Sequence, residues 1–143
     1  MHWISGHDDT VAEWAGRRFG CDFYARYAAF GIGDIDGTLI GAAVFSDYYP
    51  GGNIQLSYTG SGTLSRAIIK NIGYYAYEVL GASRITCKPP RSNAIARKLL
   101  PRAGFEFEGI LKRYYGPKKA DDALVYSLTK EKAARWMKGK KHE

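Results

Sequence analysis

The fold is decided by residues 84–113, which read RITCKPPRSNAIARKLLPRAGFEFEGILKR. Residues 84–88 form a short run typical of a strand, and the two prolines that follow stop it. Ser92 is a residue type that caps helices, and Gly104 stands where a helix ends. Residues 105–111 then predict another strand. Apolar side chains recur at helical spacing between the two strands: Ile95, Ala96, Leu99 and Ala103.

The rest of the chain extends this pattern on both sides. A helix is predicted from Asp8 and stops by Gly20, because acidic residues and Thr10 can cap its first amides. Asp36-Gly37 is typical of a hairpin turn between two strands. The predicted order is α-βββ-α-β-α-ββ, and a strand–helix–strand unit in the middle implies a right-handed crossover between parallel strands. The remaining predicted elements are a strand with Tyr27, Phe30 and Ile32, strands at 39–45, 54–59 and 123–128, and a helix at 64–79 before Gly81.

Length and charge bound the function classes. The 143 residues suit one domain, and 45% hydrophobic with 24% charged residues excludes a disordered chain. The net charge of +7 is unevenly placed: residues 1–83 hold 5 basic and 8 acidic side chains, and residues 84–143 hold 16 and 6. A basic half indicates an acidic ligand, which composition alone leaves open between nucleic acid, a phosphate-bearing cofactor and a membrane surface.

Other classes are disfavoured by what the chain lacks. It shows no signal-peptide pattern, and no apolar run approaches the roughly 20 residues that span a bilayer. Cys21 and Cys87 form no CxxC pattern, so we interpret them as reduced thiols of a cytoplasmic protein. His2, His7 and His142 have no ligand spacing, so no metal site is predicted. No recognised nucleic-acid signature accompanies the basic half, which makes nucleic acid an unlikely partner.

Residues 54–66, IQLSYTGSGTLSR, carry the first chemical signal. They predict a strand, a glycine-bearing loop and a helix start. A helix start offers unpaired amides and a positive dipole end, and glycines let the backbone close around an anion. The segment therefore fits a pyrophosphate, although Gly-Ser-Gly-Thr is also an ordinary turn. It is neither a Walker loop nor a GxGxxG dinucleotide fingerprint.

The quoted stretch also resembles the second half of the GNAT acetyltransferase superfamily. The resemblance rests on an N-x-x-A-x-x-L pattern from Asn93 to Leu99, then Gly104-Phe105 and Glu108-Gly109. It is most similar to the branch with the ribosomal-protein N-terminal acetyltransferases and short phage-type members. It covers about residues 26–129. It implies an α/β (α+β) fold, a single GNAT-like domain over residues 1–129 with a mixed central sheet of about six strands and helices on both faces. A basic C-terminal helix or tail follows at 130–143.

The resemblance implies an acetyl-CoA-dependent N-acetyltransferase that moves an acetyl group to a primary amine by direct attack. Acetyl-CoA is then a co-substrate. Asn93 is expected near the pantetheine or the amine, and Arg97, with Arg91 and Lys98, near the nucleotide phosphates. Backbone groups of Leu56, Ser57 and Tyr58 are expected to bind the pantetheine. The amides of Gly60, Gly62, Thr63, Leu64, Ser65 and Arg66 are expected to receive the pyrophosphate.

Three features depart from the family pattern. The loop has Thr59 and Leu64 where the family has other residues, and Pro101 is predicted to kink its helix. Leu100 replaces the tyrosine that often protonates the leaving thiolate, which leaves Ser65, Tyr114 or water for that step. These departures keep an alternative open, a catalytically silent GNAT-like module that binds CoA or a protein.

The base and the acceptor amine stay open. No carboxylate lies on the 54–59 strand, and Asp47 and Glu106 are candidate bases only by their nearness to strand ends. A protein N-terminus, a lysine, a polyamine or another small amine would each fit. Residues 1–25 are short for the family, so that wall of the acceptor site is expected to be either open or completed by the second subunit of a homodimer.

Overall fold

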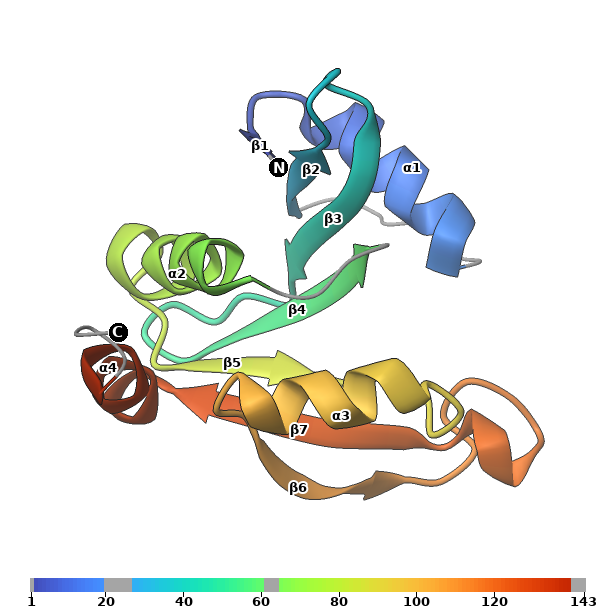
Figure 1. The fold of residues 1–143 in the computed structure, drawn as a ribbon. Helices are drawn as coiled ribbons and strands as arrows, with labels where there is room; N and C mark the ends of the chain where they lie inside the picture. The colour runs from blue at the N-terminus through green and yellow to red at the C-terminus, as the bar shows by residue number, and fades with distance from the viewer. Residues whose placement is uncertain (1, 20–26, 61–64, 140–143) are drawn as a thin grey trace. The chain divides into compact units, whose positions relative to one another are not determined.

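The computed structural model describes residues 2–19, 27–60 and 65–139 (Figure 1). Its backbone contacts divide the chain into two compact units. The first unit is Met1–Tyr48 with Gln55–Thr63, and the second is Tyr49–Ile54 with Leu64–Glu143. Among the described residues, no helix is both long and apolar enough to cross a bilayer.

The first unit is a helix packed on antiparallel strands. Strands β1, β2, β3 and β4 pair in chain order, with Phe30 opposite Ala43 and Phe45 opposite Leu56. Helix α1 has acidic residues in its first turn and basic ones in its last, as the helix dipole favours. Its bounds and those of the strands are β1 His2–Ile4, α1 Asp8–Phe19, β2 Ala28–Gly33, β3 Leu39–Ser46 and β4 Asn53–Gly60.

Small side chains let α1 approach its strands closely. Val11, Ala12 and Ala15 pack against Ala29, Ala42 and Val44 in one buried cluster. The Asp8 carboxylate also accepts a hydrogen bond from the Ala29 amide at 3.2 Å, which joins the start of α1 to β2.

The second unit places β7 between β5 and β6 and antiparallel to both. The two buried side chains of Ile85 and Leu128 meet across β5 and β7, and β6 is bulged between Phe107 and Gly109. Helix α2 continues as a π-helix, η1, and η2 is a 3₁₀ turn. The bounds are α2 Arg66–Gly73, η1 Tyr74–Val79, β5 Arg84–Cys87, α3 Ala94–Arg102, β6 Glu106–Leu111, η2 Lys119–Asp121, β7 Ala123–Thr129 and α4 Lys130–Gly139.

The predicted α/β class is confirmed, with two local corrections, to the strands and to the second predicted helix. Strand β1 was not predicted, so the described residues contain seven strands instead of about six. The second half of the predicted 64–79 helix is π-helical, with the Leu80 amide bonded to the Tyr75 carbonyl five residues back. Residues 130–139 are a helix. The predicted parallel crossover concerns the junction of the two units and stays a prediction.

Candidate active site

Strand β4 presents the residues predicted to bind pantetheine. Leu56 is buried, and Ser57 and Tyr58 are half-buried opposite Val44 and Ala43 of β3. Burial raises the pKa of the Tyr58 hydroxyl, so this group stays protonated at neutral pH. These residues and Gly60 belong to the first unit.

Gly60, the last residue of β4, lies where the neighbouring atoms leave no room for a side chain. A Cβ atom at Gly60 would lie 2.9 Å from the Tyr58 hydroxyl, and one at the opposite Gly41 would lie 3.0 Å from the Thr59 carbonyl. Arg18 of α1 donates to the Thr59 hydroxyl at 3.2 Å. Close backbone packing and the hydrogen bond from Arg18 therefore fix the position of the last residues of β4 within the first unit. The predicted binding positions Gly62, Thr63 and Leu64 lie outside the described residues.

The start of α2 is capped by Ser65. Its extended backbone lets the hydroxyl accept the Ile68 amide at 3.3 Å. Arg66 is the first helical residue, and the first turn of α2 has no acidic residue. The dipole end of this helix thus carries no carboxylate that would repel an anion.

The start of α3 is capped by Asn93, one residue later than predicted. The Asn93 side-chain oxygen accepts the Ala96 amide at 3.1 Å, and the Ser92 amide is instead bonded to the Ala120 carbonyl at 3.2 Å. Arg97 donates to the Arg91 carbonyl at 3.5 Å across the same turn. The first turn of α3 also lacks acidic residues. The exposed amide nitrogen of Asn93 has no partner among the described residues, so it can donate to a ligand.

Tyr114 lies beside the carboxyl end of β5. Its ring is half-exposed, packs edge to face on Tyr115 at 4.9 Å, and has the Lys88 ammonium 5.4 Å from its centre. The Tyr115 hydroxyl donates to the Lys88 carbonyl. Two aromatic side chains thereby join the 112–122 loop to the segment between β5 and α3.

Asp122 fixes the same loop and was missed by sequence reasoning. One of its carboxylate oxygens accepts the Arg113 amide at 2.9 Å and the Arg113 guanidinium at 3.1 Å, and the other lies 3.4 Å from Arg91. These contacts, led by the Arg113 amide, lower the pKa of Asp122. Arg91, predicted to meet phosphates, therefore neutralises Asp122 with part of its guanidinium. No spacing in the sequence indicated this pairing.

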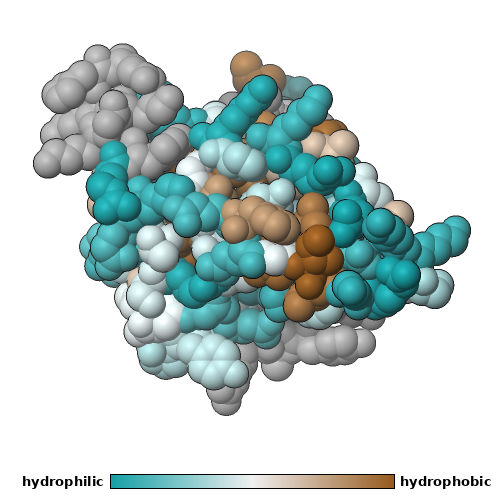
Figure 2. Space-filling model, turned by 90° about the horizontal axis from the view of Figure 1, so that it is seen from below, coloured by the Kyte–Doolittle hydropathy of each residue, from teal (hydrophilic) through white to brown (hydrophobic). Residues whose placement is uncertain are grey.

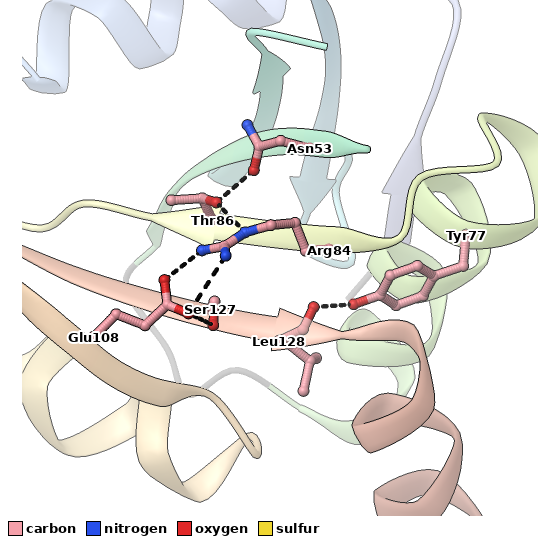
Figure 3. A network of polar contacts seen from close by, with 7 residues as sticks. All are labelled: Asn53, Tyr77, Arg84, Thr86, Glu108, Ser127 and Leu128. Atoms are coloured by element: carbon pink, nitrogen blue, oxygen red, sulfur yellow. Dashed lines mark hydrogen bonds and ion pairs between the residues drawn. The ribbon is translucent and has the colours of Figure 1, made fainter. Parts of the chain in front are cut away.

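A polar network crosses the strands of the second unit (Figure 3). Arg84 donates to the Glu108 carboxylate at 2.5 Å, and Ser127 donates to the same carboxylate at 2.9 Å. Thr86 joins Arg84 to Asn53. The hydrogen bond from Arg84, followed by that from Ser127, lowers the pKa of Glu108. Glu108 of the Glu-Gly motif thus has a strand-bridging role that only the strand pairing reveals.

The other positions considered for proton transfer are Leu100, Glu106 and Asp47, and the structure shows the surroundings of each. Leu100 is buried on the inner side of α3, so this position contributes packing. Glu106 receives a hydrogen bond from Lys132 of α4 at 2.6 Å. Asp47 has a left-handed backbone with φ of 49° directly after β3. Among residues 2–19, 27–60 and 65–139, no three acidic, His or Cys side chains are placed to hold a metal ion.

The electrostatics of the two units are opposed. The first unit holds 3 basic and 7 acidic residues, a net charge of −4, and the second holds 18 and 7, a net charge of +11. The basic residues 84–143 all belong to the second unit, which also contains the starts of α2 and α3.

No protein-family model matches the sequence, and no curated protein matches it either. Solved structures do match. Spermidine/spermine N-acetyltransferase SpeG from Vibrio cholerae with manganese ions is 18% identical, with a TM-score of 0.67 over 87% of this chain and 76% of that one. A dodecameric structure of spermidine N-acetyltransferase from Vibrio cholerae is 17% identical, with a TM-score of 0.64 over 84% and 72%. This chain therefore has the GNAT fold of these acetyltransferases.

Proposed function

We propose that this protein transfers the acetyl group of acetyl-CoA to a primary amine. The observation that carries the proposal is the fold likeness to spermidine N-acetyltransferases over most of both chains. It is supported by the N-x-x-A-x-x-L block, whose Asn93 stands at the start of α3.

Acetyl-CoA suits the basic second unit. The pyrophosphate carries negative charge, and the helix starts at Ser65 and Asn93 offer amides with no acidic side chain in the first turn. Arg66 and Arg97 stand in these first turns and add positive charge. Gly60, Gly62, Thr63 and Leu64 complete the proposed pyrophosphate loop. Leu56, Ser57 and Tyr58 offer backbone groups of a strand for the pantetheine.

The reaction needs little proton chemistry from the protein. A neutral amine attacks the thioester carbonyl, the C–N bond forms, the C–S bond breaks, and the amine proton is lost as the CoA thiolate gains one. A backbone amide near Leu56–Tyr58 would polarise the carbonyl. We propose Tyr114 as the donor that protonates the thiolate, because its side chain is exposed and Leu100 has no proton to give. Ser65 is a weaker donor, since its oxygen caps α2.

We further propose a small cationic amine as acceptor. The similar structures are of enzymes named for spermidine, and the first unit of this chain carries a net charge of −4. Opposite charge attracts a polyamine to such a surface and raises its association rate. A neutral or acidic acceptor gains nothing from it.

The test combines turnover with binding. Release of CoA thiol is followed with spermidine, spermine and short peptides as acceptors, and CoA affinity is measured by calorimetry. Spermidine-dependent release supports the proposal. CoA binding without release for any amine selects the alternative, a catalytically silent CoA- or protein-binding module, which the buried Leu100 favours. No binding at millimolar CoA overturns the proposed transferase and the CoA-binding form of the alternative.

Asn93 allows a matched pair of variants. Asn93→Asp keeps the side-chain oxygen that caps α3 but loses the amide donor, whereas Asn93→Ala loses both. If the amide contacts substrate, both variants lose activity and only Asn93→Ala loses stability. Full activity in Asn93→Asp removes Asn93 from the proposed site.

A further inference from the structure

The loop between β6 and β7, residues 112–122, is ordered by polar contacts and has no hydrophobic core of its own. Residues 112–115 and 117–120 are exposed. Hydrophilic residues predominate at the right of Figure 2, the side on which this loop lies in Figure 1. All of residues 112–122 are described, and only Asp122 is buried, with 2% of its surface exposed. The conformation of the loop therefore depends on what Asp122 binds.

The Asp122 carboxylate holds Arg113 in a strained backbone conformation. Arg113 has a left-handed backbone with φ of 56°, which a residue with a Cβ atom adopts only at a cost in free energy. One carboxylate oxygen of Asp122 offsets this cost, because it accepts the Arg113 amide at 2.9 Å and the Arg113 guanidinium at 3.1 Å. Hydrogen bonds to an ionised carboxylate are stronger than those between neutral groups. Tyr114 follows directly, so the backbone at Arg113 determines where the Tyr114 hydroxyl lies.

Main-chain atoms around Asp122 hold the segment that leads into α3. The Arg91 amide donates to the Asp122 carbonyl at 2.7 Å, and the Ser92 amide donates to the Ala120 carbonyl at 3.2 Å. Asn93, the cap of α3, comes next in the chain. These bonds do not involve the Asp122 carboxylate. Asp122 therefore fixes the start of α3 through its main chain and the position of Tyr114 through its side chain.

We propose that Asp122 is a positioning residue for acetyl transfer, whose carboxylate keeps Tyr114 in a fixed place relative to Asn93 at the start of α3. The inference rests on the proposed function, in which Tyr114 protonates the CoA thiolate. Tyr114 gives its proton to the sulfur as the C–S bond breaks and regains one from solvent, which takes the proton that the amine loses. Asp122 acts through Arg113 and does not itself transfer a proton.

The first experiment measures kcat and KM in a variant without the carboxylate. Asp122→Asn keeps the shape of the side chain but leaves one acceptor oxygen for the donors of Arg113 and Arg91. We expect kcat to fall at least about tenfold, and the KM for acetyl-CoA to change less than about threefold, because the main-chain bonds that hold α3 remain.

Glu108→Gln is the matched control, since it also replaces a carboxylate beside an arginine of the second unit, Arg84. It should keep kcat within about twofold of the wild-type value. An Asp122→Asn variant with the kcat of wild type overturns the proposal, and so does an equal fall of kcat in both variants.

Rescue separates positioning from a general loss of structure. Glycine adopts a positive φ without strain, so Arg113→Gly in the Asp122→Asn background should recover most of kcat, whereas Arg113→Ala in that background should not. Tyr114→Phe should lower kcat by itself, and adding Asp122→Asn should lower it little further, because both changes affect the same step. Equal activity of the glycine and alanine variants overturns the proposal. So do losses that multiply, or a Tyr114→Phe variant as active as wild type.

Hydrogen exchange distinguishes a failure of this inference from a failure of the proposed function. In Asp122→Asn the Arg113 amide should exchange at least about tenfold faster than in wild type. The Arg91 amide, which is bonded to a carbonyl, should keep its rate. Unchanged exchange at Arg113 overturns the positioning by Asp122 whether or not the chain is active. Wild type that releases no CoA thiol with any amine defeats the proposed function, and with it the catalytic role of Asp122, even when Arg113 responds as expected.

Discussion

The hydrogen bond between η1 and β7 allows a sharp test of the packing. The hydroxyl of Tyr77, whose side chain is 6% exposed, donates to the Leu128 carbonyl (Figure 3). Tyr77→Phe keeps the ring and removes only the donor. The buried Leu128 carbonyl then loses the hydrogen bond that it accepts from the Tyr77 hydroxyl. Such a loss costs about 1–3 kcal/mol, and we expect about 1 kcal/mol because Leu128 also lies in the β5–β7 ladder.

The measurement is urea unfolding followed by circular dichroism. A cost of about 1 kcal/mol lowers the urea midpoint by roughly 0.3–1 M, because the slope of the transition is about 1–3 kcal/mol per M and should not change. Tyr74→Phe is the control, because Tyr74 is 64% exposed and its loss should cost less than about 0.3 kcal/mol. Equal midpoints for the two variants would refute the reasoning. A loss above about 4 kcal/mol would also refute it, since the ring would then have moved.

Three further predictions concern other parts of the molecule. Arg84 and Ser127 lower the pKa of Glu108 in the folded protein below its ordinary 4.5. The ionised Glu108 therefore stabilises the folded state above about pH 4.5, and this contribution is lost as the pH falls through the lowered pKa. In Glu108→Gln the urea midpoint should therefore fall less than in wild type between about pH 5 and pH 3. An equal fall in both proteins would contradict this prediction. Ser65→Ala should cost about 1 kcal/mol of unfolding free energy. Ser65→Asp should restore stability yet weaken CoA binding about fivefold in calorimetry, since a carboxylate near the phosphates repels them, and unchanged affinity would argue against a phosphate site there. Finally, burial raises the pKa of the Cys87 thiol, so in a Cys21→Ser chain a disulfide reagent should react at least ~100-fold faster after unfolding than before, and similar rates would show that Cys87 is accessible.

Helices and strands in which apolar residues recur at regular spacing were predicted from the sequence. Helix α3 and strand β4 were found because their apolar spacing and end residues agree, and Gly81 and Gly104 have the positive φ of 72° and 93° expected after a helix. Strand β1 has three residues, too few to show alternation, and it forms because β2 offers an edge. The cap of α3 was misplaced since Ser92 and Asn93 are equally suitable by type. A tertiary bond from the Ser92 amide to Ala120 decides between them.

The site was predicted only where its residues are close in sequence. The starts of α2 and α3 were predicted to within one or two residues because the signals at helix ends are local, whereas the roles of Ser65 and Asn93 in a site stay predictions. The partners of Glu108 and Asp122 were not, because strand pairing and the folded 112–122 loop bring Arg84 and Arg113 to them. The roles of Gly62, Thr63 and Leu64 stay predictions.

The π-helical turn at Tyr74–Val79 has a consequence for variation of the chain. A π turn holds more residues than an α turn of the same segment, so it is a place where the backbone can lose one residue and still close as a regular helix. The segment between Ser65 and β5 could then change in length by one while both of its ends keep their positions. Insertions and deletions among relatives should gather here, on the exposed side that Glu78 and Val79 occupy.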